Sequence, residues 1–127
     1  MIKHTLALAL TAVLLAGCVT TRNNDDGSVD ARRGQTVNVG GPKVTPLAVL
    51  EDSRCPMEAR CIWAGRVRLS VRVTTDAGSA VRELASDKPL QVADGQLTLQ
   101  GTMPPRSTQR TLVPSDYRFT LKFNGGR

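Results

Sequence analysis

The residues best suited to covalent chemistry in this 127-residue chain are its three cysteines, Cys18, Cys55 and Cys61. Five residues separate Cys55 from Cys61, and Pro56 begins a Met-Glu-Ala-Arg run short enough for a tight loop or one helical turn. A disulfide between these two cysteines is therefore geometrically easy. In the chain-entropy model, closing a loop of about seven residues stabilises the fold by about 2.4 kcal/mol, before any strain in the native ring is subtracted.

The same two cysteines could instead be redox-active or bind a metal ion. Their spacing differs from the Cys-x-x-Cys of disulfide oxidoreductases, and two thiolates without another soft ligand make a poor zinc site. Both observations favour a structural disulfide. Thiol chemistry by Cys55 and Cys61 remains the alternative.

The start of the chain has the features of a signal peptide. A short positively charged start is followed by an apolar segment, residues 5–16, that is too short to span a bilayer. Leu15-Ala16-Gly17-Cys18 resembles the lipobox of bacterial lipoproteins, which implies removal of residues 1–17 and lipidation of Cys18. Val19 stands where an inner-membrane retention signal has Asp, so the resemblance points to the outer membrane of a Gram-negative cell, facing the periplasm. The alternative is ordinary secretion with an incidental cysteine.

Lipidation of Cys18 would leave Cys55 and Cys61 free to pair with each other in an oxidising compartment. Residues 19–34 are polar and rich in Asn, Asp, Gly, Ser, Thr and Arg, so residues 18–34 are expected to be the lipidated cysteine and a flexible tether. Arg32-Arg33 in this segment could contact anionic headgroups or simply be solvated.

Residues 35–127 are expected to form one all-β domain, because no long stretch has apolar residues at helical spacing. The clearest strand is Ile62–Thr75, where apolar and polar residues alternate as in a half-buried strand. Trp63 shares the apolar parity, so we expect it in the core near the disulfide. The other expected strands are Gln35–Val39, Lys43–Glu51, Ala80–Ala85, Pro89–Ala93, Gln96–Gln100 and Tyr117–Phe123.

Turn residues refine this prediction. Asp94-Gly95 indicates a hairpin, and Pro46 indicates an edge strand or a bulge. Asp52 is interpreted as a turn former whose carboxylate accepts a nearby backbone N–H. Residues 112–117 resemble the tyrosine corner of immunoglobulin-like sandwiches, in which the hydroxyl, here that of Tyr117, bonds to nearby backbone. The resemblance implies an immunoglobulin-like β-sandwich of about seven strands, with a small β-barrel as the alternative.

Two motifs resemble those of a family of small bacterial lipoproteins and secreted proteins that has no characterised function. They are Asp-Ser-Arg-Cys-Pro at residues 52–56 and Cys-x-Trp-Ala-Gly at residues 61–65. Weaker similarity extends over most of the mature domain. The resemblance implies no catalytic residues.

Few side chains of the mature chain are suited to catalysis. The only histidine, His4, lies in the signal peptide, which excludes Ser-His-Asp and Cys-His catalysis and removes the commonest ligand of catalytic zinc. No glycine-rich phosphate loop is present, and the carboxylates lack metal-ligand spacing. We therefore expect no enzymatic activity, no cofactor and no metal.

The formal net charge of +6 becomes about +5 when Lys3 is removed with the signal peptide. Arg66, Arg68 and Arg72 are expected on one exposed strand face, which could attract an anionic envelope component or an acidic protein partner. Simple solvation of these arginines is the alternative. Nucleic acid is disfavoured by the location and by the shortage of exposed aromatic residues.

The sequence thus predicts a lipid-anchored protein of the bacterial envelope with a non-catalytic binding or accessory domain. Two alternatives remain: a thiol-redox protein using Cys55 and Cys61, and an inhibitor or stabilising domain for another envelope protein.

Overall fold

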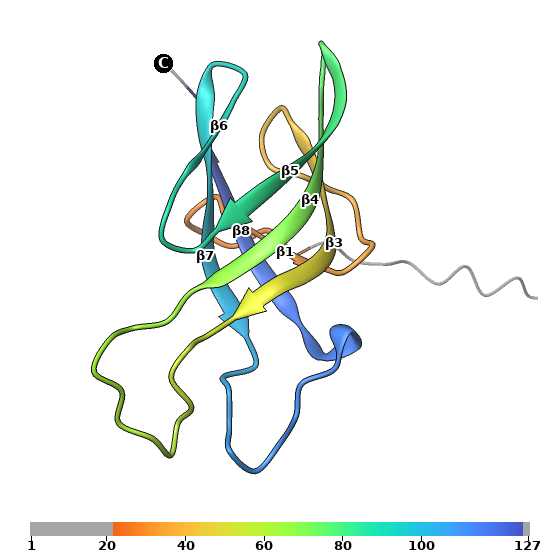
Figure 1. Cartoon of the computed structure of the whole chain (residues 1–127). Helices are drawn as coiled ribbons and strands as arrows, with labels where there is room; N and C mark the ends of the chain where they lie inside the picture. Colours follow the sequence, from red (N-terminus) through yellow and green to blue (C-terminus); the bar gives the residue numbers. More distant parts are fainter. Residues whose placement is uncertain (1–21, 126–127) are drawn as a thin grey trace, which may run out of the picture.

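The computed structural model describes residues 22–125, which form two four-stranded antiparallel sheets (Figure 1). The sheet orders are β1-β8-β7-β6 and β2-β3-β4-β5. The predicted all-β sandwich is confirmed, with eight strands in place of about seven. The elements are β1 (Val29–Arg32), β2 (Val37–Asn38), β3 (Lys43–Asp52), β4 (Val67–Thr75), β5 (Gly78–Ala85), β6 (Leu90–Val92), β7 (Gly95–Met103), the short 3₁₀ helix η1 (Pro114–Asp116) and β8 (Arg118–Asn124).

The chain passes through the strands in the order in which they stand around the sandwich. β2 to β5 follow one another across one sheet, β6 to β8 across the other, and β1 lies beside β8. This is an up-and-down path, whereas immunoglobulin domains have Greek-key connections. The resemblance of residues 112–117 to immunoglobulin sandwiches therefore does not extend to the strand connections.

The core lies between the two sheets and follows the alternation of the strands. In β4 the odd positions from Val67 to Val73 are buried, as the period-two pattern predicted. Each fully buried Val, Leu or Phe side chain stabilises the fold by about 1.5–3 kcal/mol. The facing sheet contributes Leu97, Leu99, Phe119 and Leu121. None of the described residues forms a helix long and apolar enough to cross a membrane.

Residues 22–34, the described part of the segment that was expected to be a flexible tether, belong to the fold. Residues 29–32 form β1, in which Val29 lies opposite Leu121 of β8, and both Val29 and Ala31 are buried. The Gly34 N–H donates to the carbonyl of Pro46 (2.7 Å). The prediction failed because two apolar residues give too weak a pattern, and their burial depends on pairing with a strand at the other end of the chain.

The strand predicted from Ile62 begins only at Val67, where its pairing with β3 starts opposite Asp52. Residues 62–66 belong to a loop, and Trp63 is 76% exposed, so its predicted burial is wrong. Residues 62–66 have no strand partner on β3, so the alternation of β4 does not extend to them. A Cβ on Gly65 would collide with the backbone of Ser53, so glycine allows the two ends of the loop to approach.

The predicted turn features are close to those observed. A register shift in the β3–β4 pairing follows Pro46, which confirms the bulge. The hairpin turn consists of Ala93-Asp94, between Val92 and Gly95, one residue earlier than Asp94-Gly95. Gly95 instead lies against the backbone of β8, where a Cβ has no room.

Candidate functional site

Two long connections leave the same end of the sandwich and lie side by side (Figure 1). The first, residues 53–66 between β3 and β4, is called here the disulfide loop. The second, residues 104–117 between β7 and β8, is called the β7–β8 loop. The predicted disulfide joins Cys55 and Cys61, whose Cα atoms lie 5.9 Å apart. It closes the outer part of the first loop into a ring.

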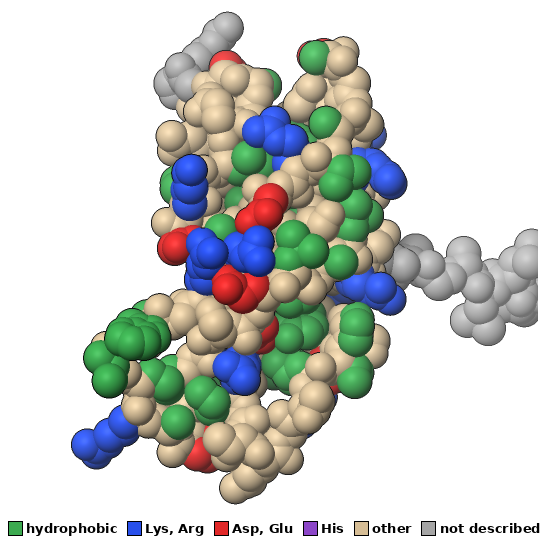
Figure 2. Space-filling view, in the orientation of Figure 1, with side chains coloured by type: hydrophobic (Ala, Val, Ile, Leu, Met, Phe, Trp, Pro, Cys, Tyr) green, Lys and Arg blue, Asp and Glu red, His purple; other side chains and the backbone are tan. Residues whose placement is uncertain are grey.

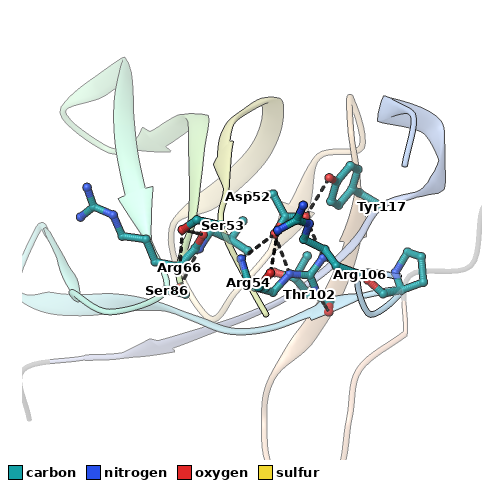
Figure 3. A network of polar contacts seen from close by, with 10 residues as sticks. Asp52, Ser53, Arg54, Arg66, Ser86, Thr102, Arg106 and Tyr117 are labelled. Atoms are coloured by element: carbon teal, nitrogen blue, oxygen red, sulfur yellow. Dashed lines mark hydrogen bonds and ion pairs between the residues drawn. The ribbon is translucent and has the colours of Figure 1, made fainter. Parts of the chain in front are cut away.

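Arg54 connects the base of the disulfide loop to the opposite sheet (Figure 3). Its Nε and Nη2 atoms donate to the two carboxylate oxygens of Asp52, at 2.8 and 2.9 Å. Its Nη1 and Nη2 atoms also donate to the carbonyl oxygens of Thr102 (2.8 Å) and Pro104 (3.0 Å). A bidentate arginine–carboxylate pair is among the stronger polar contacts in proteins, and this one is mostly shielded from water.

Asp52 also accepts a hydrogen bond from the hydroxyl of Tyr117 (2.9 Å). The tyrosine thus bonds to a carboxylate on the other sheet, and not to nearby backbone as a tyrosine corner implies. The backbone N–H of Arg54 donates to Asp52 (3.4 Å), which agrees with the predicted turn role. Asp52 and Tyr117 are therefore structural residues that join the two loops at their base.

The pKa values of this pair are shifted apart. Partial burial raises the pKa of Asp52, but the hydrogen bonds from Arg54 and Tyr117 outweigh it and hold that pKa below its usual value. Burial, together with the neighbouring Asp52 carboxylate, raises the pKa of Tyr117 to about 12. At neutral pH the carboxylate stays ionised and the phenol stays protonated, which suits a fixed structural contact better than proton transfer.

A second group of hydrogen bonds joins the two loops nearer their tips. Arg106 donates from Nη1 to the carbonyl of Arg54 (2.7 Å) and accepts from the Met57 N–H through its own carbonyl (3.0 Å). Glu58 accepts from the Ser107 hydroxyl and from the Thr108 N–H (2.9 Å), and these bonds lower its pKa. The disulfide loop is therefore held by its own ring and by its neighbour.

The tip of the disulfide loop exposes large apolar side chains. Met57, Ile62 and Trp63 are 66%, 91% and 76% exposed. In Figure 2, hydrophobic side chains gather at the lower left, where Figure 1 places this loop. Apolar side chains grouped on a surface commonly mark an interaction site. The sequence signal for this was the position of Trp63 between the cysteine pair and Gly65, a segment that is a loop despite its alternating pattern.

The predicted basic face of β4 is largely neutralised. The Nε atoms of Arg66 and Arg68 lie 2.7 and 3.3 Å from Oε2 of Glu51. Arg68 Nη1 also lies 2.8 Å from the Glu83 carboxylate, and Arg66 Nη1 lies 3.6 Å from that of Asp87. Only Arg72 of the three has no ion pair among the described residues. Figure 2 shows acidic and basic side chains intermixed on this side.

Cys18, the predicted lipidation site, and residues 1–17 lie outside the described residues. Within residues 22–125, no three His, Cys, Asp or Glu residues are grouped so that they could hold a metal ion. No family model matches the chain, and no similar curated protein or solved structure was found.

Proposed function

We propose that this chain is a lipid-anchored protein of the bacterial envelope that binds a protein partner through the tip of the disulfide loop, without catalysing a reaction. The observation that carries this proposal is the exposure of Met57, Ile62 and Trp63 on a loop that is braced by a disulfide and by hydrogen bonds to its neighbour. The envelope location rests on the resemblance of residues 15–18 to a lipobox.

The physical argument concerns preorganisation. A loop fixed before binding loses less conformational entropy when it meets a partner, so more of the contact energy appears as affinity. Tryptophan is enriched among the residues that dominate binding energy at protein interfaces. Full burial of an aliphatic side chain such as Ile62 contributes about 1.5–3 kcal/mol. The three exposed side chains would therefore be the main anchors of the proposed binding surface.

An accessory protein, an inhibitor and a stabilising domain would each have to bind another protein. The proposed contact through the loop tip is therefore compatible with all three roles. The thiol-redox alternative has one observation in its favour, the exposure of Cys61. Thiol titration of the folded protein separates the two. No free thiol and slow reduction by dithiothreitol support the structural role, whereas rapid exchange supports redox chemistry.

The proposed contact is tested by chemical crosslinking in intact cells. The Ile62→Ser/Trp63→Ser variant should lose the crosslinked partner. Val81→Ser is the matched control, because Val81 is also apolar and exposed (57%) but lies on β5, away from the loop. Retention of the partner by the loop variant, or equal loss in both variants, would contradict the proposal.

The proposed anchor is tested separately by fractionation. The Cys18→Ser chain should leave the membrane fraction or stay unprocessed, because stable anchoring needs acyl chains that serine cannot accept through a thioether. Fractionation and gel migration identical to those of the wild type would reject the lipoprotein assignment.

A further inference from the structure

Beside β1, arginines from three parts of the chain line one shallow pocket of about 180 Å³. Arg22 precedes the strand, Arg32 ends it, and Arg118 begins β8. The backbone N–H of Asp30 donates to the carbonyl of Arg22 (3.2 Å), which holds Arg22 beside the strand. The remaining lining residues are Asp30, Ala31 and Gln35.

The positive charge of this pocket is poorly compensated. Arg32 and Arg118 are directly opposite each other in the β1–β8 pairing, an arrangement in which like charges destabilise a sheet. Across residues 22–125, no ion pair includes Arg22, Arg32 or Arg118. The one carboxylate in the lining, that of Asp30, accepts hydrogen bonds from Thr120 (2.7 Å) and Asn24 (3.3 Å). Arg66 and Arg68 show the opposite pattern, because Glu51 and Glu83 lie within ion-pair distance of them.

The position of the pocket in the chain indicates what could neutralise it. Arg22 follows Cys18 by four residues, and a chain of four residues spans at most about 14 Å even when fully extended. A lipid on Cys18 would therefore keep the pocket within reach of the membrane surface.

We infer that this arginine pocket binds the phosphate groups of anionic phospholipids in the membrane that anchors the chain. The inference rests on the lipid anchor of the proposed function and adds a second membrane contact to it. The planar guanidinium group of arginine binds phosphate oxygens through two parallel hydrogen bonds. An anionic phosphate placed between Arg32 and Arg118 would also relieve their mutual repulsion. A basic patch beside an acyl chain is a common way to strengthen membrane binding and fix orientation.

The test uses the mature chain, residues 18–127, with Cys18→Ser, which keeps every described residue and lacks the lipid. Binding is measured by co-sedimentation with phosphatidylcholine vesicles and with vesicles that also contain phosphatidylglycerol. We expect binding only to the anionic vesicles, and it should weaken as salt is added. The Arg32→Ser/Arg118→Ser variant should bind about 30-fold more weakly, since each arginine near an anionic surface contributes about a fivefold gain in affinity.

The control is Arg72→Ser/Arg82→Ser, which removes the same charge from β4 and β5, where neither arginine forms an ion pair among the described residues. It should retain binding within about threefold. Neither variant should have a lower melting temperature than the wild type, since surface substitutions usually cost under about 0.5 kcal/mol and loss of the Arg32–Arg118 repulsion favours the sheet.

Equal weakening in both variants would show a general charge effect and overturn the inference. Equal binding to both kinds of vesicle would do the same. If inorganic phosphate, added at constant ionic strength, displaced the protein from the anionic vesicles, the pocket would be assigned to a free anion and not to a lipid. The protein in this assay carries no acyl chain and has an intact loop tip. A negative result would therefore not contradict the proposed lipid anchor or the proposed partner contact, which have separate tests.

Discussion

Among single residues, Arg54 is expected to have the largest effect on the arrangement of the two loops, because its guanidinium group bonds to Asp52, Thr102 and Pro104. Replacing it with Met keeps much of the side-chain volume but removes the guanidinium donors of Asp52 and of the Thr102 and Pro104 carbonyls. Asp52 would keep only its hydrogen bonds from the Tyr117 hydroxyl and the backbone N–H of residue 54. Loss of charge-assisted hydrogen bonds in a mostly shielded site should lower the free energy of unfolding by about 2 kcal/mol, measured by urea denaturation.

Arg66→Met is the matched control for Arg54→Met. It breaks an ion pair whose two side chains are about half and one-third exposed, and such pairs are worth under about 1 kcal/mol. If Arg54→Met lowered the free energy of unfolding by no more than Arg66→Met does, the assigned role of Arg54 would be contradicted.

Tyr117 should make stability depend on alkaline pH. In the folded state its pKa is raised to about 12, so the folded protein keeps a proton that the unfolded chain loses near pH 10. The stability contributed by this difference is complete below about pH 10 and is lost as the pH rises toward 12. Melting temperatures should fall across this interval in the wild type and fall less in Tyr117→Phe. Parallel curves for the two proteins would show that Tyr117 titrates normally.

At the scale of elements, the disulfide should stabilise the loop more than the sheets. Replacing Cys55 and Cys61 with Ser should lower the free energy of unfolding by about 2.4 kcal/mol, the value expected for a ring of this size. Far-ultraviolet circular dichroism should remain that of a strand-rich protein, because the ring lies outside β3 and β4. Loss of the strand signal would mean that the ring is required for the sheets to form.

The elements that the sequence predicts best are those whose burial follows from a simple repeat. The alternation from Val67 to Val73 identifies the buried face of β4, because every second side chain points toward the other sheet. The same alternation wrongly predicts Trp63 to be buried, because the pattern does not show that the pairing of β4 with β3 begins only at Val67. β1 is not predicted from the sequence for a different reason. Val29 and Ala31 are buried through pairing with β8, a strand about ninety residues later in the chain.

The candidate sites show the same limit. The sequence placed Arg66, Arg68 and Arg72 on one face but could not show that carboxylates from β3 and β5 lie beside them, because such pairs depend on strand register. Register also brings Arg32 and Arg118 together, although 86 positions separate them in the sequence. The disulfide could be predicted because its two cysteines are only six positions apart in the sequence.

For the whole molecule, the two proposed contacts lie in different places. The arginine pocket is beside β1, close in sequence to the proposed anchor, whereas the disulfide loop extends from one end of the sandwich (Figure 1). A domain held at the membrane by the first contact could therefore present the second to a protein partner. Trp63 is the only tryptophan of the chain, so a probe at position 63 takes the place of the one exposed indole on the loop tip.

The most direct measurement places a photoreactive amino acid at position 63 and, as a control, at position 81, followed by irradiation of intact cells. We predict a discrete protein adduct from position 63 that is absent from position 81. The adduct should weaken in the Cys55→Ser/Cys61→Ser background, where the loop is no longer braced. Adducts of equal intensity from both positions, or adducts only with lipid from position 63, would contradict the claim that the disulfide loop binds a protein partner.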